Sequence, residues 1–224
     1  HQHACLVKLD KIQACLKQHV KIFFINGKML LLNYPLIQMY IPKCLVYLCQ
    51  CLVINFIRKN NPEIVAFQEV RDDTGFNKKG DNQAKQLNKE LKFPYYAFYP
   101  TTNKQKERPE KYKNYCIEGT AVLSKYPILK FEGIKLKKQK EDRYNCGNLY
   151  VKIKAKKIID LIVVHFSNSD LFSLLHLIET LKWVSGKKIK PIILGDFNMR
   201  HSEWLHDLIE GDYTSSLKYK KYLS

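Results

Sequence analysis

The segment Ile192–Asn198, with the sequence IILGDFN, is the stretch of the chain that decides the fold. Its apolar run is typical of a buried β-strand, and a glycine, a carboxylate and an amide follow it. Alternate residues of a strand point to the same face, so Asp196 and Asn198 should project together from the strand end. Gly195 leaves room there for a substrate or another backbone segment. This pair suits the positioning of a phosphate, a hard metal ion or a water molecule, although an ordinary Asp-Asn turn is the alternative interpretation.

Two further apolar runs end in polar functional groups. The run EIVAFQE ends at Gln68 and Glu69, and the run IIDLIVVH ends at His165. Three strand ends would then supply a metal ligand, a general acid/base or phosphate binder, and a water-positioning pair. An exposed carboxylate at Glu69 and a structural histidine at His165 are the alternatives.

Four segments in order give the chain a family resemblance. They are Asn61–Val70 (NPEIVAFQEV), Glu118–Ile128 (EGTAVLSKYPI), Val164–Ser167 (VHFS) and Leu194–Arg200 (LGDFNMR). In order and spacing the chain resembles the endonuclease/exonuclease/phosphatase superfamily, also called DNase I-like, over roughly residues 54–214. The resemblance implies the α/β class and a four-layer α/β sandwich, in which helices flank two β-sheets. It also implies metal-assisted phosphoester hydrolysis at one end of the sheets.

The same resemblance implies roles for individual residues. Glu69 would hold a Mg²⁺ ion, with Mn²⁺ as an alternative, and Asn33 at the end of an early strand would be a second metal ligand. Asp196 would orient or deprotonate the attacking water, and Asn198 would position Asp196 and a phosphate oxygen. His165 would bind the phosphate or assist the leaving group.

Three more residues are expected around this site. Gln68 would brace Glu69 from behind, and Asn168 and Arg143 would contact the substrate. For the early asparagine, Asn26 is the weaker alternative to Asn33, because a glycine follows it and suggests a hairpin turn.

The formal charge of +17 indicates a polyanionic partner. Nucleic acid is the expected partner, an anionic lipid head group is the alternative, and no obligate protein partner is implied. Lys is a point charge that suits phosphate contact better than base readout. A compositional bias toward Lys is the plainer explanation. The clusters are Lys104–Lys113, Lys135–Lys140, Lys152–Lys157, Lys187–Lys190 and Lys218–Lys221.

These features leave three functions open. The first is a Mg²⁺-dependent nuclease, the second is a phosphodiesterase or phosphatase of lipid or inositol head groups, and the third is an inactive fragment that binds polyanions. Metal-dependent turnover would separate the first from the third.

The seven cysteines form no zinc or redox pattern, which favours reduced thiols in an intracellular protein, cytoplasmic or nuclear. Residues 29–57 are rich in apolar side chains, but Pro35 and Pro42 interrupt them, and Cys44–Ile57 is too short to span a membrane. That segment is expected to be a buried helix, and membrane attachment through residues 29–57 is the less favoured alternative.

The chain is expected to be a single domain over residues 1–224, of which residues 1–53 match the family poorly. The family ends on a strand with an Asp-His pair, and no such pair follows Asn198. We therefore expect the last strands to be missing, activity to be weak, and a strand edge to be unpaired.

Local patterns predict the remaining elements. Helices are expected at Gly80–Leu91, Leu171–Val184 and Ser202–Glu210; strands at Phe93–Tyr99, Thr120–Leu123, Ile128–Leu136 and Leu149–Ile153; and loops at Arg71–Lys79 and Thr101–Tyr115.

Overall fold

Strands and helices alternate up to the fourth strand, and three further strands then follow without a helix. The computed structural model describes residues 29–33 and 43–199, with side chains from Gln50 onward. The elements are β1 (Met29–Asn33), α2 (Lys43–Asn60), β2 (Ile64–Asp73), α3 (Gln83–Leu91), β3 (Tyr95–Asn103), α4 (Lys104–Glu107), β4 (Cys116–Ser124), β5 (Ile128–Lys135), β6 (Gly147–Lys154), β7 (Ile158–His165), α5 (Asp170–Lys187) and β8 (Ile192–Asp196).

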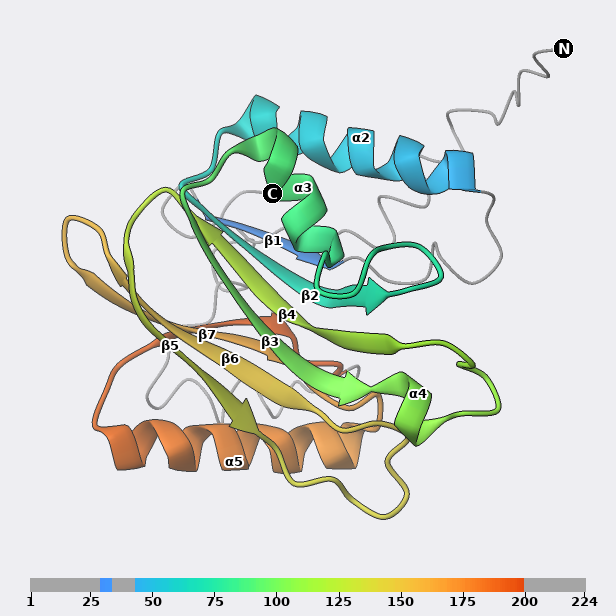
Figure 1. Cartoon of the computed structure of the whole chain (residues 1–224). Coiled ribbons are helices and arrows are strands. Elements are labelled where there is room, and N and C mark those ends of the chain that lie inside the picture. The colour runs from blue at the N-terminus through green and yellow to red at the C-terminus, as the bar shows by residue number, and fades with distance from the viewer. Residues whose placement is uncertain (1–28, 34–42, 200–224) are drawn as a thin grey trace, which may run out of the picture.

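The strands form two four-stranded sheets. One sheet has the order β1-β2-β4-β3, and the other has the order β5-β6-β7-β8. Each sheet is mixed, because β1 pairs with β2 and β7 pairs with β8 in parallel, while the other pairs are antiparallel. Helices α2 and α3 cover the outer face of the first sheet, and α5 covers the outer face of the second (Figure 1). The predicted α/β class with two sheets flanked by helices is therefore confirmed.

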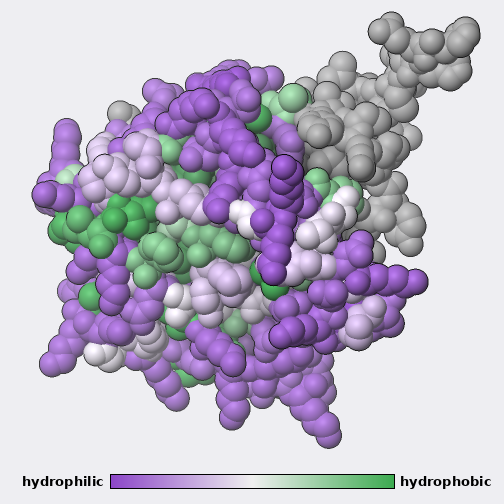
Figure 2. Space-filling model, viewed as in Figure 1, coloured by the Kyte–Doolittle hydropathy of each residue, from purple (hydrophilic) through white to green (hydrophobic). Residues whose placement is uncertain are grey.

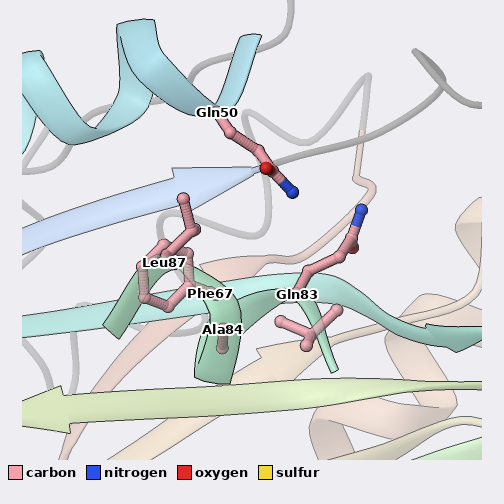
Figure 3. A pocket seen from close by; sticks show the side chains of 6 residues that line it. Gln50, Phe67, Gln83, Ala84 and Leu87 are labelled. Atoms are coloured by element: carbon pink, nitrogen blue, oxygen red, sulfur yellow. The ribbon is translucent and has the colours of Figure 1, made fainter. Parts of the chain in front are cut away.

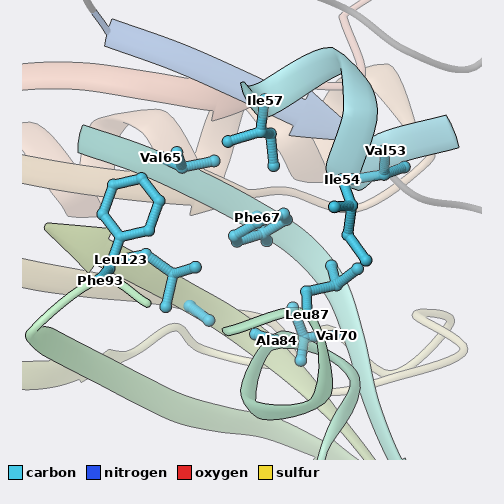
Figure 4. Close-up of a cluster of buried hydrophobic side chains, with 11 residues drawn as sticks. Val53, Ile54, Ile57, Val65, Phe67, Val70, Ala84, Leu87, Phe93 and Leu123 are labelled. Atoms are coloured by element: carbon cyan, nitrogen blue, oxygen red, sulfur yellow. The ribbon is translucent and has the colours of Figure 1, made fainter. Parts of the chain in front are cut away.

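Strand β2 shows how the sequence builds these layers. Val65 and Phe67 pack with α2 and α3 on one face, as Figure 4 shows, while Ile64 and Ala66 pack toward the second sheet. A continuous apolar run is what a strand buried on both faces requires. A third cluster, which includes Phe166, fills the layer between the second sheet and α5.

The boundaries of two predicted loops were wrong. Strand β2 continues to Asp73, which lies opposite Cys116, and β3 continues to Asn103, which lies opposite Ile117. Polar residues continue these strands because β4 gives their backbone groups partners. The first four residues after Asn103 form the short helix α4.

Helix α3 begins at Gln83 rather than at Gly80. Its start is fixed by Asn82, whose side chain accepts a hydrogen bond from the backbone N–H of Lys85. The predicted buried helix over Cys44–Ile57 corresponds to α2. The predicted helix over Ser202–Glu210 and the alternative asparagine Asn26 lie outside the described residues.

A small cavity lies between α2, α3 and β2. Figure 3 shows the side chains that line it, with Gln50 and Gln83 at its polar side. Its volume of about 10 Å³ is no larger than a single water needs, so it is a packing defect rather than a ligand site.

Among the described residues, none of the helices has the length and apolar character needed to cross a membrane.

Candidate active site at the ends of the two sheets

Glu69 lies at an irregular point of β2. The pairing with β4 shifts register between Phe67 and Val70, so Gln68 and Glu69 form a bulge. Glu69 has a φ of 54°, the left-handed region that a residue with a Cβ seldom adopts. Such strain costs about 1–3 kcal/mol and persists only where the surrounding structure imposes it. The bulge interrupts the regular alternation of side chains along β2, and the Glu69 carboxylate lies against the second sheet at His165.

The ends of β7 and β8 lie side by side. His165 and Asp196 are register partners in the parallel pair, and the backbone N–H of Phe166 donates to the carbonyl oxygen of Asp196 over 3.0 Å. Gly195 has a φ of 145°, and a Cβ there would lie 1.9 Å from the carbonyl oxygen of Val164. Only glycine fits this crossing, so the glycine of IILGDFN is what lets Asp196 sit beside His165.

Asn198 connects the two strand ends. Its backbone N–H donates to Asp196 Oδ1 over 3.0 Å, and its side-chain Nδ2 donates to the carbonyl oxygen of Phe166 over 2.9 Å. Its φ of 51° makes it the second residue of this group, with Glu69, in the left-handed region. Asn198 therefore orients Asp196 directly and holds the backbone next to His165.

The two sheets bring these groups together. His165 Nε2 lies 3.5 Å from Glu69 Oε1, and both side chains are about three-quarters buried. Burial raises the pKa of Glu69, the charge of His165 opposes this rise, and the nearby carboxylates of Glu118 and Asp196 add to it. One end of the two sheets thus holds a carboxylate from the first sheet and a histidine and an aspartate from the second.

A buried ion pair beside Glu69 was missed by the sequence interpretation. Lys104 Nζ lies 2.6 Å from Glu118 Oε2, and the two side chains are only 13% and 9% exposed. Lys104 also lowers the pKa of Glu69 in part. Glu118 is the first residue of the segment EGTAVLSKYPI, so the family resemblance could have pointed to it. Lys104 is one of several lysines in its cluster, and nothing in the sequence distinguishes it from the others.

The donor set fits a hard divalent cation. Glu69, Glu118 and Asp196 give this region three carboxylates, against one lysine and one histidine. Burial has raised the pKa of Glu69, and a cation at its carboxylate would oppose that effect. Among the residues that the structure describes, Glu69 would hold the ion.

The other predicted site residues are Asn33, Gln68, Asn168 and Arg143. Asn33 ends β1 and is the register partner of Gln68, so its backbone lies beside the residue that precedes Glu69. Gln68 is fully buried, and among the described residues its amide atoms have no hydrogen-bond partner, so the predicted brace to Glu69 is not formed as a direct bond. Asn168 and Arg143 are exposed, in the loop after β7 and the loop before β6.

A second group of metal-ligating residue types comes from α5 and the loop before β6. One ligand atom each from Asp142, Cys146 and His176 lies within 4.8 Å of the other two. His176 Nδ1 accepts from the backbone N–H of Ser167, so its proton is on Nε2, which points to Asp142 Oδ2 at 3.9 Å. Burial lowers the pKa of His176 and keeps it neutral. Because Nε2 carries the proton, this group is a polar brace for Ser167 rather than a metal site.

The comparisons with known proteins concern the family and the fold of the chain. Residues 47–216 match the model of the Endonuclease/Exonuclease/phosphatase family. A comparison with curated protein sequences gives no match. Solved structures with a similar fold include an endonuclease/exonuclease/phosphatase from Beutenbergia cavernae DSM 12333, with a TM-score of 0.52 and 19% identity over 66% of this chain.

Two further similar structures carry different chemistry in their names. Sphingomyelinase C from Streptomyces griseocarneus has a TM-score of 0.52 and 18% identity over 75% of this chain. ANGEL2, a 2′,3′-cyclic phosphatase in complex with adenosine-2′,3′-vanadate, has a TM-score of 0.52 and 16% identity over 71% of this chain.

The chain spans 42%, 64% and 46% of these three proteins, less than two thirds of each. At such identities the likeness concerns the fold alone, and the family model covers most of the chain. The chain belongs to the endonuclease/exonuclease/phosphatase family, whose members are phosphoester hydrolases that generally use divalent metal ions.

Proposed function

We propose that the chain is a divalent-metal-dependent phosphodiesterase that acts on nucleic acid, with Mg²⁺ as its ion and Mn²⁺ as a substitute. The observation that carries the proposal is the meeting of Glu69 with His165 and Asp196 across the two sheets. A hard cation held at Glu69 would offset the charge that develops on the phosphate in the transition state.

The side chains of the second sheet divide the remaining work. Asp196 accepts the backbone N–H of Asn198 on Oδ1, and its carboxylate would orient a water or take its proton. His165 lies within 3.5 Å of Glu69 and would donate a hydrogen bond to a phosphate oxygen or to the leaving group. Asn198 fixes the distance between these two groups through Phe166.

The net charge of +17 favours nucleic acid as the substrate class. A lipid head group is the second candidate. Leu171 and Leu175 are 62% and 38% exposed near the start of α5, which begins five residues after His165, and a membrane surface would accept such side chains.

The test measures hydrolysis of bis(p-nitrophenyl) phosphate and plasmid DNA with Mg²⁺, Mn²⁺ or EDTA. Metal-dependent turnover should fall by about two orders of magnitude or more in Asp196→Asn, as expected for a lost general base. The matched variant Asp81→Asn removes a carboxylate on the outer surface, where Asp81 pairs with Lys89, and should retain turnover.

Four outcomes decide against the proposal. Turnover in EDTA, or turnover that Asp196→Asn leaves unchanged, contradicts the assigned chemistry. Divalent-ion binding in calorimetry that Glu69→Gln does not weaken contradicts the metal assignment. Salt-sensitive DNA binding without turnover in any metal would identify an inactive polyanion binder.

A further inference from the structure

An aromatic and basic surface lies beyond Glu69, at the same end of the two sheets. It is built by three loops: residues 74–80 after β2, residues 108–115 after α4, and residues 136–146 between β5 and β6, all at the right-hand end in Figure 1. Figure 2 shows mainly hydrophilic residues over the lower right of this view and hydrophobic residues gathered toward the left. We call the following residues the aromatic–basic surface: Phe76, Lys79, Lys111, Tyr112, Arg143 and Tyr144.

Two cations hold the rings of this surface in place. The guanidinium carbon of Arg71 lies 6.0 Å from the ring centre of Phe76 and 5.8 Å from that of Tyr112. Lys104 Nζ lies 5.8 Å from the ring centre of Tyr112 and 4.9 Å from that of Tyr144. Three rings from three loops are therefore linked through Arg71 and Lys104.

The linking cations are already neutralised by carboxylates. Arg71 pairs with Asp73, and Lys104 pairs with Glu118. Their role is to fix the rings, because a buried ion pair offers little net charge to a ligand. Rings that are held in one orientation lose little conformational entropy when a ligand stacks on them.

The surface is continuous with the proposed active site. Arg71 follows Glu69 by two residues on β2, and its register partner on β4 is Glu118. Glu118 in turn pairs with Lys104, whose charge acts on Glu69. A polymeric substrate whose phosphate lies at Glu69 would therefore place the groups next to that phosphate over the rings.

The free positive charge lies around the rings. Lys111 and Lys79 are exposed, with Nζ 5.5 Å from the ring centre of Tyr112 and 4.9 Å from that of Tyr115. Arg143 is exposed and makes no ion pair with the described residues.

A surface hollow of about 530 Å³ adjoins the rings, and Arg143 lines it together with Glu107, Arg108 and Glu110. Arg108 is paired with Glu110, and Glu107 is paired with Lys138, so Arg143 is the uncommitted charge of the hollow.

Flat rings beside uncommitted cations match the chemistry of unpaired nucleotides. An unpaired base offers a flat face for stacking, and each nucleotide adds a phosphate for a lysine or arginine. Bases within a duplex are stacked on one another and are closed to such contact, and a lipid head group has no flat ring. We propose that the aromatic–basic surface binds the unpaired nucleotides next to the scissile phosphate, so that single-stranded nucleic acid is the preferred substrate. This proposal rests on the proposed function for its substrate class, although binding can be tested without turnover.

The test measures the affinity of a fluorescein-labelled single-stranded 12-mer by anisotropy in EDTA. Stacking of one base is worth about 1–3 kcal/mol, so Phe76→Ala and Tyr112→Ala should each weaken binding by about 5- to 150-fold. The matched control is Phe131→Ala on β5, because Phe131 is 52% exposed and Phe76 is 40% exposed. Phe131→Ala should leave the affinity unchanged, and the duplex 12-mer should bind more weakly than the single strand.

Arg143→Gln tests the phosphate contact separately. It should lower the slope of log affinity against log salt by about 0.7 for one lost phosphate of a single strand. Lys157→Gln, which removes an exposed lysine in the turn between β6 and β7, is the matched control and should leave the slope unchanged.

The proposal is overturned if Phe76→Ala and Phe131→Ala behave alike, or if duplex and single strand bind equally. It is also overturned if the 12-mer does not bind and the chain instead binds sphingomyelin vesicles through a contact that Leu171→Ala abolishes. Turnover separates this proposal from the proposed function: Phe131→Ala should leave hydrolysis of bis(p-nitrophenyl) phosphate intact, and Glu69→Gln should remove hydrolysis while the 12-mer still binds. If the 12-mer binds through the rings but the chain hydrolyses no phosphodiester, the binding surface is supported and the proposed enzymatic function is rejected.

Discussion

The ends of β2 and β8 solve the same geometric problem in opposite ways. At each end the chain must leave regular strand geometry to bring Glu69 and Asp196 close to each other. Strand β8 uses Gly195, whose φ of 145° needs no Cβ, whereas β2 uses Glu69 itself at a φ of 54°. The first end is permitted by the absence of a side chain, and the second is held in strain by the sheet around it. The β8 end should therefore tolerate no added atom, and the β2 end should gain stability when its charge is removed.

The largest expected effect is at the glycine. In Gly195→Ala the new Cβ would lie 1.9 Å from the Val164 carbonyl oxygen, so the strands must separate, at a cost on the order of 4 kcal/mol in the free energy of unfolding. Urea denaturation measures this. Gly186→Ala in α5, where a Cβ meets nothing within 4 Å, is the control and should stabilise by about 0.5–1 kcal/mol. A loss below about 1 kcal/mol in Gly195→Ala would show that β8 is not so constrained.

The β2 side should depend instead on charge balance. Lys104→Met leaves Glu118 buried without its partner and should cost about 3 kcal/mol in the free energy of unfolding. Lys130→Met removes one partner of the more exposed pair with Glu132 and should cost under about 1 kcal/mol. The double variant Lys104→Met/Glu118→Gln should recover much of the loss. Equal effects of the two lysine variants would refute the charge argument.

Asn198→Gly sharpens the comparison at the β8 end. The backbone can keep its conformation, while the side chain that bonds to Phe166 is removed. Glycine accepts the φ of 51° without strain, so stability should change little while the hydrogen bond to Phe166 is lost. Misplacement of Asp196 and His165 should lower kcat on the order of 100-fold. Steady-state kinetics with bis(p-nitrophenyl) phosphate measures this. Asn61→Gly, at a φ of 44° between α2 and β2, is the control for a general effect of glycine, and an equal loss of kcat in both variants would show that the Asn198 side chain does not orient the site.

The smallest expected effect is the pH dependence of stability at Glu69. Its pKa is raised above 4.5 by burial, so the unfolded chain ionises first as the pH rises. The folded state then binds more protons than the unfolded state, and the Glu69 contribution to stability falls from about pH 4.5 upward through the raised pKa. In EDTA, Glu69→Gln should therefore melt a few degrees above the wild-type chain at pH 7 and close to it at pH 4.

Divalent ions provide the control for the Glu69 prediction. A cation that binds the wild-type carboxylate stabilises only that chain, so millimolar Mg²⁺ or Mn²⁺ should reduce or reverse the difference at pH 7. A Glu69→Gln variant that melts below the wild type in EDTA at pH 7 would contradict the cost assigned to this buried carboxylate.

Local patterns were enough to find most of the fold. The apolar runs before Glu69, His165 and Asp196 predicted β2, β7 and β8, since a strand buried on both faces needs an unbroken apolar sequence. The ends of β2 and β3 were misplaced because Asp73 and Asn103 are polar and gain their strand geometry only from pairing with β4.

The amino-acid sequence by itself determined the strand-end residues of this protein, because period, glycine placement and residue type are local properties. Only the tertiary structure decided that Glu69 meets His165 across two sheets and that Lys104 pairs with Glu118. It also decided that Phe76, Tyr112 and Tyr144 share one surface. Such contacts join segments far apart in the chain, and no local pattern encodes them, because packing of the two sheets fixes which loops become neighbours.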